Sequence, residues 1–259
     1  MNTKEYIKDV FQNLWFPIQF MMLSLSFLPS TLFSLIASTD IATLSSVDRF
    51  KDAWFARFWG VYGSTARERA SEHAEGIIKA ASGIVLDIGP GSGEWLHIFD
   101  KSKVTKIYGV EPNRDHYEGL RKRIKDAGLT DIYEIAECGV EGLTQWGIED
   151  ESVDSVVTIL CLCSVGQPEY MIRDLYNKLR NGGTWGVYEH VVKKQEGLIS
   201  KYQSLINIAW PHIMGGCSLR RDTEKSLREA GKWNKVDLKQ PDGMPSYAVL
   251  PHIMGVLEK

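Results

Sequence analysis

The stretch Val85–Trp95, VLDIGPGSGEW, decides the fold of this chain. Its first residues are mostly apolar and predict a buried strand, and the glycines that follow predict a tight turn into a helix. A turn of this kind presents backbone N–H groups and a positive helix end to a ligand, and glycine allows the ligand to approach the main chain closely. The stretch therefore predicts a nucleotide-type binding site at the end of the strand.

The spacing of the turn narrows the choice of ligand. Its glycines stand at alternate positions, Gly89, Gly91 and Gly93. A dinucleotide fingerprint places its third glycine one residue later, where this chain has Glu94, whose carboxylate is expected to repel a pyrophosphate. Asp87 precedes the turn and Glu111 closes the next predicted strand. We expect Glu111 to accept both hydroxyls of a ribose, and Asp87 either to hold the turn or to reach an amino group through water.

The sequence around the turn alternates between strand and helix patterns. Strands are predicted at residues 84–88, 106–113, 132–138, 152–165, 184–191, 235–240 and 252–259. Helices are predicted at residues 67–81, from 95 onward, at 116–128, at 168–183 and at 222–231, the last with Asp222 as its N-cap. This order predicts an α/β fold, a Rossmann-like, seven-stranded and mainly parallel sheet with helices on both faces.

Composition sets the class of protein. The chain has 259 residues, of which 44% are hydrophobic and 24% charged, which suits one well-filled domain with an appendage. Its net charge of -3 provides no basic stripe for a phosphate backbone, so nucleic acid is not expected as a partner.

The cysteines predict a reduced, intracellular protein. There are four, Cys138, Cys161, Cys163 and Cys217, and none of their spacings is C-x-x-C. Cys161 and Cys163 fall in an apolar run and are expected to behave as small buried hydrophobes. The pentapeptide PHIMG occurs at Pro211 and at Pro251, which we interpret as coincidence. No metal site is expected.

The N-terminal segment differs from the rest of the chain. Residues 10–39 contain no charged side chain and are rich in leucine, phenylalanine and methionine, although Pro17 and Pro29 interrupt them. Three arrangements fit this pattern: a helix pair in one leaflet of a membrane, a membrane span, or an apolar lid over the protein's own pocket. We predict an anchor or lid segment at residues 1–46 and a catalytic domain at residues 47–259, beginning with an aromatic-rich helix.

The motifs from residue 71 onward resemble those of the class I S-adenosylmethionine-dependent methyltransferases. The resemblance implies S-adenosyl-L-methionine as the cofactor, with the glycine turn around its methionine part and Glu111 on its ribose. The cofactor-binding residues expected on this basis are Asp87, Gly89, Gly91, Gly93, Glu111, Pro112, Val140, Glu141 and Cys161. Gly139 stands where the family often has an aspartate that contacts adenine. Adenine recognition is therefore expected from backbone groups around Val140 and Glu141.

A narrower resemblance is to the membrane-associated small-thiol methyltransferases. It rests on LCLCSV at residues 160–165, YEHV at 188–191, GGCSLRRDTEKSL at 215–227 and PHIMG at 251–255. The resemblance implies methyl transfer to a small-molecule nucleophile, a thiol or a hydroxyl of a small metabolite. It also implies an intracellular protein that associates peripherally with the cytoplasmic face of an endomembrane. If the N-terminus is a lid and not an anchor, the protein is expected in the cytoplasm.

Candidate catalytic residues follow from the sheet. Ligands bind at the carboxyl ends of parallel strands, which brings Ser164, Glu189 and His190 toward the pocket. His190 is the first candidate base, with Glu189 beside it and His212 as the second histidine. The residues expected to line the substrate pocket are Ser164, Trp210 and Met214.

Two other functions fit the same residues. In one, the fold and cofactor are kept while the enzyme catalyses a cyclisation or rearrangement without methyl transfer. In the other, the domain is a non-catalytic scaffold held at a membrane, which the intact turn and Glu111 disfavour. Consumption of the cofactor distinguishes the first from a methyltransferase, and cofactor binding distinguishes the second.

Overall fold

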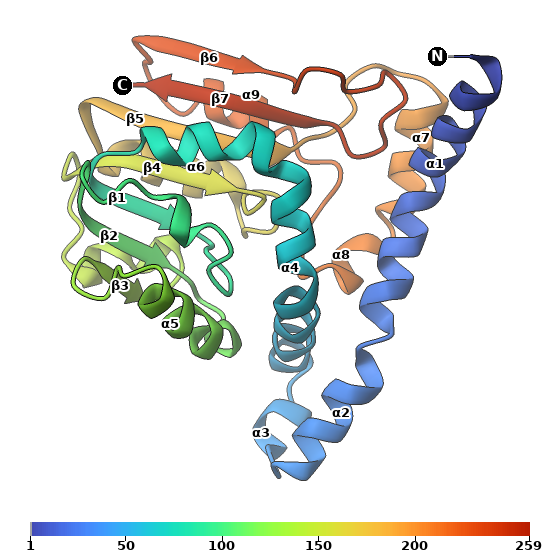
Figure 1. Cartoon of the computed structure of the whole chain (residues 1–259), viewed down its shortest axis with the longest axis horizontal. Helices are drawn as coiled ribbons and strands as arrows, with labels where there is room; N and C mark the ends of the chain where they lie inside the picture. The colour runs from blue at the N-terminus through green and yellow to red at the C-terminus, as the bar shows by residue number, and fades with distance from the viewer. Residues whose placement is uncertain (1) are drawn as a thin grey trace.

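The computed structural model describes residues 2–259 and has a seven-stranded sheet at its centre (Figure 1). Its strands are β1 (Gly83–Ile88), β2 (Val104–Val110), β3 (Tyr133–Ala136), β4 (Val153–Ile159), β5 (Leu179–His190), β6 (Lys235–Lys239) and β7 (His252–Glu258). They lie in the order β3-β2-β1-β4-β5-β7-β6. Strands β1 to β5 are parallel, whereas β7 is antiparallel to both of its neighbours. The predicted Rossmann-like fold is confirmed.

Helices pack on the two faces of the sheet or lie beside it. They are α1 (Thr3–Leu25), α2 (Leu28–Ala37), α3 (Ile41–Leu44), α4 (Val47–Ala80), α5 (Tyr117–Asp126), α6 (Pro168–Lys178), α7 (Leu198–Ile206), α8 (Trp210–Ile213) and α9 (Thr223–Arg228). Neighbouring residues of a strand point to opposite faces, so Val85 packs with α4 and α5, and Leu86 packs with α6 and α9. Both faces of β1 are therefore buried, which accounts for its apolar sequence.

The N-terminal helices lie along one side of the domain (Figure 1). The sequence predicted an interruption at Pro17, but α1 continues through this buried proline. Hydrogen bonds attach α1 to the domain: the indole N–H of Trp54 donates to the carbonyl of Ser24 (2.7 Å), and Tyr202 of α7 donates to the carbonyl of Leu14 (2.7 Å). α2 and α3 extend beyond the sheet, at the far end of α4.

Three local predictions were wrong. The residues after the glycine turn form turns and one 3-10 turn, Leu96–Ile98, in place of an α-helix. The two helices expected at residues 47–63 and 67–81 are one continuous helix, α4, whose N-cap is Ser46. No element is predicted at residues 192–221, yet this stretch contains α7 and α8. The helix at 222–231 is confirmed in α9, with the Asp222 side chain accepting from the Lys225 N–H.

Replacement of Gly255 by alanine should destabilise the fold strongly. Gly255 has a φ of +142°, and a Cβ there would lie 1.8 Å from the backbone carbonyl oxygen of Asp237 on β6. Neither backbone can give way without breaking the pairing of β6 with β7, so we expect a loss of about 3 kcal/mol or more. Urea unfolding measures it. Gly243, with a φ of +78° and open space around it, is the control for backbone strain alone, and equal losses at the two positions would contradict the clash.

Candidate active site

A cavity of about 680 Å³ lies at the carboxyl-terminal ends of β1, β2, β4 and β5. The last residues of β1, β2 and β4, which are Ile88, Val110 and Ile159, border it. Helices α1, α4 and α8 cover it with aromatic side chains, which include Phe16, Phe20, Phe55, Trp59, Tyr62 and Trp210. The position is the one where open α/β sheets bind ligands, and the volume suits a small-molecule site.

The glycine turn forms one wall of this cavity. All three glycines have positive φ angles, +65° at Gly89, +56° at Gly91 and +89° at Gly93. A Cβ at Gly89 would lie 2.9 Å from the Cys161 side chain, so only glycine leaves the main chain exposed to a ligand there. Gly89, Gly91 and Cys161 line the cavity, whereas Gly93 does not and instead packs against Leu96.

Glu111 ties the turn to the end of β2. One carboxylate oxygen accepts the N–H of Gly91 at 2.9 Å, and the other accepts the N–H of Asn113 at 2.9 Å. Burial raises the pKa of Glu111 to about 7, although the two N–H donors act in the opposite direction. Each carboxylate oxygen retains an acceptor position for a ligand hydroxyl, and Glu111 and Pro112 both line the cavity.

The carboxylates of Asp87 and Glu94, on either side of the glycine turn, do not line the cavity. Asp87 is buried and accepts a hydrogen bond from the Tyr133 hydroxyl at 2.9 Å, and it is not among the residues that line the cavity. Of its two expected roles, its position supports the one that holds the turn. Glu94 is paired with Arg123 at 2.9 Å and also lies outside the cavity lining. The position of its carboxylate therefore does not support the expected repulsion of a pyrophosphate in the cavity.

Replacement of Asp87 by asparagine should flatten the pH dependence of stability. Burial raises the pKa of Asp87 to about 7, above its value in the unfolded chain. The free energy of unfolding is therefore highest below about pH 4, where Asp87 is protonated in both states, and it falls as the pH rises toward 7. The asparagine side chain keeps an acceptor for the Tyr133 hydroxyl and stays neutral. Relative to the native protein, the variant should gain up to about 1.4 kcal/mol per pH unit within that window. Urea unfolding between about pH 4.5 and 7.5 tests this, and parallel curves would contradict it.

The loop after β3 borders the cavity with the residues expected near adenine. Gly139, Val140 and Glu141 all line it, and Val140 begins a 3-10 helix that ends at Trp146. A Cβ at Gly139 would lie 2.4 Å from the carboxylate of Glu141, an exposed side chain that would have to move to admit an aspartate here. The loop therefore presents backbone groups and Glu141 to the cavity.

The structure separates the three candidate catalytic residues. His190 lines the cavity, whereas Glu189 and His212 do not. Adjacent residues of a strand face opposite sides, so Glu189 and His190 of β5 are unable to reach the same pocket. Glu189 is fully buried and accepts the N–H groups of Cys161 and Leu162, each at 3.0 Å, so it holds the loop after β4. The positions of Glu189 and His212 therefore do not support the catalytic role expected for them.

The expected substrate-pocket residues lie together. Ser164, Trp210 and Met214 all line the cavity. The position of α1 beside the cavity agrees with the lid alternative for residues 1–46, whereas the contribution of α4 was missed, because the helical spacing of its aromatic residues predicts packing on the domain. Also missed were Cys163, Cys217 and His252, which border the same cavity. The helical spacing of Phe55, Trp59 and Tyr62 is the signal for α4, but it does not tell a cavity wall from a core.

Residues 62–232 match the model of a methyltransferase domain family. The chain belongs to this methyltransferase family. It is 30% identical over 203 residues to thiol S-methyltransferase TMT1B of Mus musculus, an alignment that covers 77% of this chain and 80% of that protein. The activity depends on S-adenosyl-L-methionine, as the resemblance of the sequence motifs implied.

Two solved structures share the fold of this methyltransferase. One is the [4+2]-cyclase SpnF, with a TM-score of 0.55, 17% identity and coverage of 76% of this chain and 80% of that chain. The other is an O-methyltransferase family protein from Burkholderia thailandensis, with a TM-score of 0.56, 15% identity and coverage of 82% and 60%. Enzymes with different reactions share this architecture, so the acceptor has to be argued from the site.

Proposed function

We propose that this methyltransferase transfers a methyl group to the thiol of a small apolar molecule, at the surface of a membrane. The observation that carries the proposal is the apolar acceptor end of the cavity. Phe58, Cys163, Trp210, Met214 and Cys217 form a buried cluster there, and Phe20, Phe55, Trp59 and Tyr62 pack against it. We call this set the aromatic wall. The similarity to a thiol S-methyltransferase agrees with the same acceptor.

The residues at the other end fit S-adenosyl-L-methionine. The glycine turn offers its main chain, Glu111 offers two acceptors for ribose hydroxyls, and Val140 and Glu141, which line the cavity, are proposed to contact adenine. These residues follow β1, β2 and β3, whereas the aromatic wall meets the ends of β4 and β5. The cofactor supplies a methyl carbon on a cationic sulfur, which is electrophilic. The chain's own task is to align a nucleophile with that carbon and exclude water.

A thiol suits this site better than a hydroxyl. A thiol ionises near pH ~8.5, whereas an alcohol requires a strong, well-placed base. The carboxylates among the described lining residues are Asp52, Glu111 and Glu141, and none belongs to the ends of β4 or β5. His190, an expected catalytic residue, borders the acceptor end and is proposed to act there. Ser164, Trp210 and Met214 are proposed to hold the acceptor.

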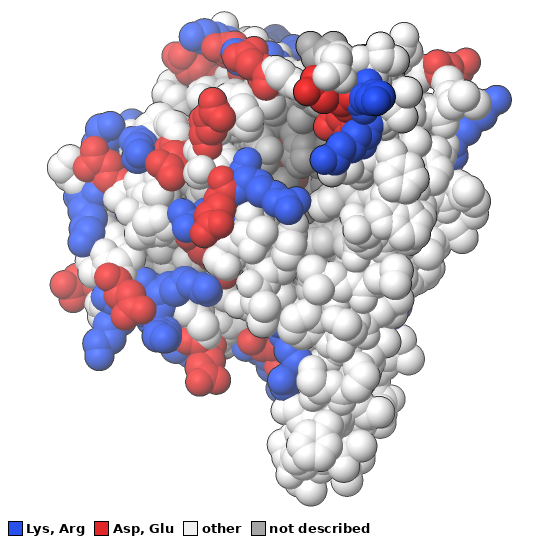
Figure 2. Space-filling view, turned by 45° about the vertical axis from the view of Figure 1, so that its right-hand side comes forward, with Lys and Arg blue, Asp and Glu red and all other residues white. Residues whose placement is uncertain are grey.

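The membrane part of the proposal rests on the outer face of the N-terminal helices. Residues 3–37 have a mean hydropathy of 1.8 in their most apolar window, of which 17% is buried, and this length and composition suffice to cross a membrane. The outer face of α1 carries Phe11, Trp15 and Met22, all exposed. Figure 2 shows an extended surface without charged residues on this side. Such a surface is expected to bury itself in lipid.

The apolar surface continues onto α7. Leu198 and Leu205 of α7 and Ile208, just after it, are exposed, and α7 contacts α1 through the Tyr202–Leu14 hydrogen bond. A surface shared by two distant segments fits a protein that lies on one leaflet better than a single crossing helix. We therefore propose peripheral association, with residues 1–46 as both anchor and lid. An intracellular site on the cytoplasmic face of an endomembrane remains a prediction from the sequence.

The test is an acceptor panel. The purified full-length protein is incubated with methyl-labelled S-adenosyl-L-methionine and alkyl thiols, aryl thiols, phenols and amines of matched size, and mass spectrometry follows labelled product and S-adenosylhomocysteine. We expect transfer to apolar thiols. Transfer to phenols or amines but not to thiols would contradict the proposal. Tight cofactor binding without consumption by any acceptor would favour cyclisation or rearrangement chemistry.

A further inference from the structure

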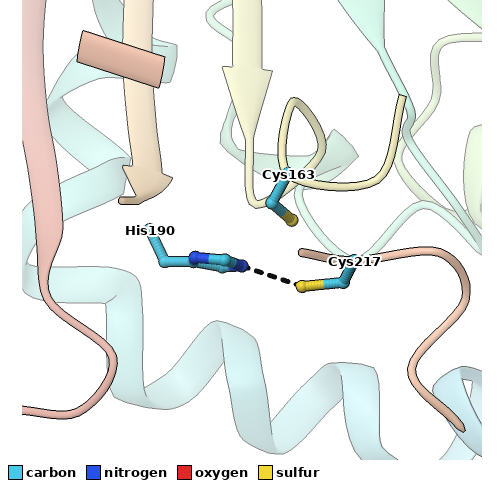
Figure 3. Close-up of side chains that lie close together, drawn as sticks. All are labelled: Cys163, His190 and Cys217. Carbon is cyan, nitrogen blue, oxygen red and sulfur yellow. Dashed lines mark hydrogen bonds between the residues drawn. The ribbon is translucent and has the colours of Figure 1, made fainter. Parts of the chain in front are cut away.

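Two thiols and an imidazole meet in the cavity at the ends of β4 and β5 (Figure 3). Cys163 lies in the loop after β4, His190 ends β5, and Cys217 lies in the loop after α8. Their sulfur and ring-nitrogen atoms all lie within 4.8 Å of one another, and all three residues are buried. They come from three segments that are far apart in the sequence, so the fold, and no local motif, brings them together.

The polar contacts of this cluster involve sulfur. The Nε2 atom of His190 lies 2.8 Å from the Cys217 sulfur, and the indole N–H of Trp210 donates to the same sulfur at 3.1 Å. An indole N–H only donates, so the Cys217 sulfur acts as an acceptor in this contact. The His190 Nδ1 atom has no partner among the described residues, so it is free to carry the ring proton and leave the Nε2 lone pair toward the sulfurs.

We propose that Cys163, His190 and Cys217 bind one Zn²⁺ ion and leave its fourth position open to the cavity. Two thiolates and one imidazole form a ligand set that zinc enzymes use, and three protein ligands with an open position mark catalytic rather than structural zinc. In a tetrahedral site, Zn–S distances of about 2.3 Å place two sulfurs about 3.8 Å apart. The ligand atoms of the cluster all lie within 4.8 Å of one another, and the 2.8 Å separation of the His190 Nε2 atom from the Cys217 sulfur would widen when both bind one ion.

All three residues line the cavity, so the open position faces the acceptor end. The sequence predicted a buried hydrophobe at Cys163 and a base at His190. The proposed metal site gives both a different role, with His190 as a ligand.

The substrate part of this inference rests on the proposed function. An acceptor thiol that takes the fourth position loses its proton to solvent, because a metal-bound thiol is deprotonated. The resulting thiolate uses a sulfur lone pair to form a bond to the cofactor's methyl carbon, while the bond from that carbon to the cationic sulfur breaks. The products are a thioether and S-adenosylhomocysteine. The neutral thioether no longer supplies a thiolate to the metal, which favours release of the product.

The first experiment measures metal on the full-length protein, purified without chelators or a polyhistidine tag. We expect about one zinc ion per chain. Exchange for Co²⁺ should produce the visible absorption of a tetrahedral cobalt site and an intense near-ultraviolet band from thiolate ligands. The variants Cys163→Ser, His190→Ala and Cys217→Ser should each lose most of the metal. Cys138→Ser, which changes a cysteine outside the cavity lining, should retain it.

The spectrum of the unaltered protein decides the proposal even where a variant fails to fold. If it takes up no more Co²⁺ than the Cys163→Ser/Cys217→Ser double variant, the metal site is wrong. A disulfide between Cys163 and Cys217 in protein purified under reducing conditions would overturn it as well. An added alkyl thiol should shift the visible cobalt bands, and unshifted bands with the metal bound would overturn the open coordination position.

The failures of the two proposals are distinguishable. Chelator-treated protein that contains no metal but methylates thiols at an undiminished rate would remove the zinc proposal and leave the proposed function standing. Protein that holds zinc at this site but methylates only phenols or amines would remove the thiol function and leave the metal site standing.

Discussion

Glutamate in place of both Phe33 and Ile36 should release the methyltransferase from membranes. These side chains lie on α2, are 75% and 57% exposed and do not line the cavity. Burial of each in hydrocarbon contributes about 1.5–3 kcal/mol, so loss of both lowers partition by about 10²-fold or more. Co-sedimentation with phosphatidylcholine vesicles measures the effect. Affinity for S-adenosylhomocysteine should stay unchanged.

A matched control separates this effect from added charge. Thr130→Glu with Gln145→Glu places the same two carboxylates at exposed positions of the domain and should leave sedimentation unchanged. If both double variants pellet with vesicles like the native protein, α2 is not part of the membrane surface.

A substitution on the inner face of α1 should change acceptor binding and leave membrane binding unchanged. Phe20 lines the cavity and packs against Phe58, Tyr62 and Trp210. Phe20→Ala should raise the KM for the acceptor thiol while the protein still pellets with vesicles, because it removes a part of the aromatic wall and no outer side chain. An unchanged KM in steady-state kinetics would remove α1 from the acceptor site.

Replacement of Glu111 by alanine should weaken cofactor binding. The buried carboxylate accepts the N–H groups of Gly91 and Asn113, so its loss leaves both donors unpaired and removes the proposed contact with the ribose. We expect a cost of about 1.5–3 kcal/mol, which corresponds to a Kd about 10 to 150 times higher. Calorimetric titration with S-adenosylhomocysteine measures this change.

Glu134→Ala is the control for Glu111→Ala. Glu134 is an exposed carboxylate on β3, paired with Lys106 at the surface, and its removal should leave the Kd unchanged. Equal affinity of the native protein and Glu111→Ala would remove Glu111 from the cofactor site, whatever the effect on stability.

The sequence predicted the sheet well, and most of the residues that it assigned to the cofactor line the cavity, because both depend on local patterns. A buried strand, a turn that requires positive φ at Gly89 and an acid at the end of the next strand are visible in short stretches. The face that a side chain points to is fixed by strand register and by what packs on the sheet. Glu189 and His190 are neighbours in sequence, yet only His190 lines the cavity.

The acceptor end was less predictable for a different reason. Its wall is assembled from α1, α4 and α8 and from the loop that carries Cys217, which are far apart in sequence. Apolar residues with helical spacing indicate burial, but they do not say whether the partner is a core, a ligand or lipid. The meeting of Cys163, His190 and Cys217 is likewise a product of tertiary structure alone.

The two faces of α1 have a consequence for kinetics. Phe16 and Phe20 border the cavity, while Phe11 and Trp15 on the same helix are exposed on its outer side. In the proposed membrane-bound state, one helix thickness separates acceptor dissolved in the bilayer from the cavity. The concentration that governs turnover is then the mole fraction of acceptor in lipid. Added vesicles that carry no acceptor should slow the reaction by surface dilution, although the bulk concentration of acceptor is unchanged.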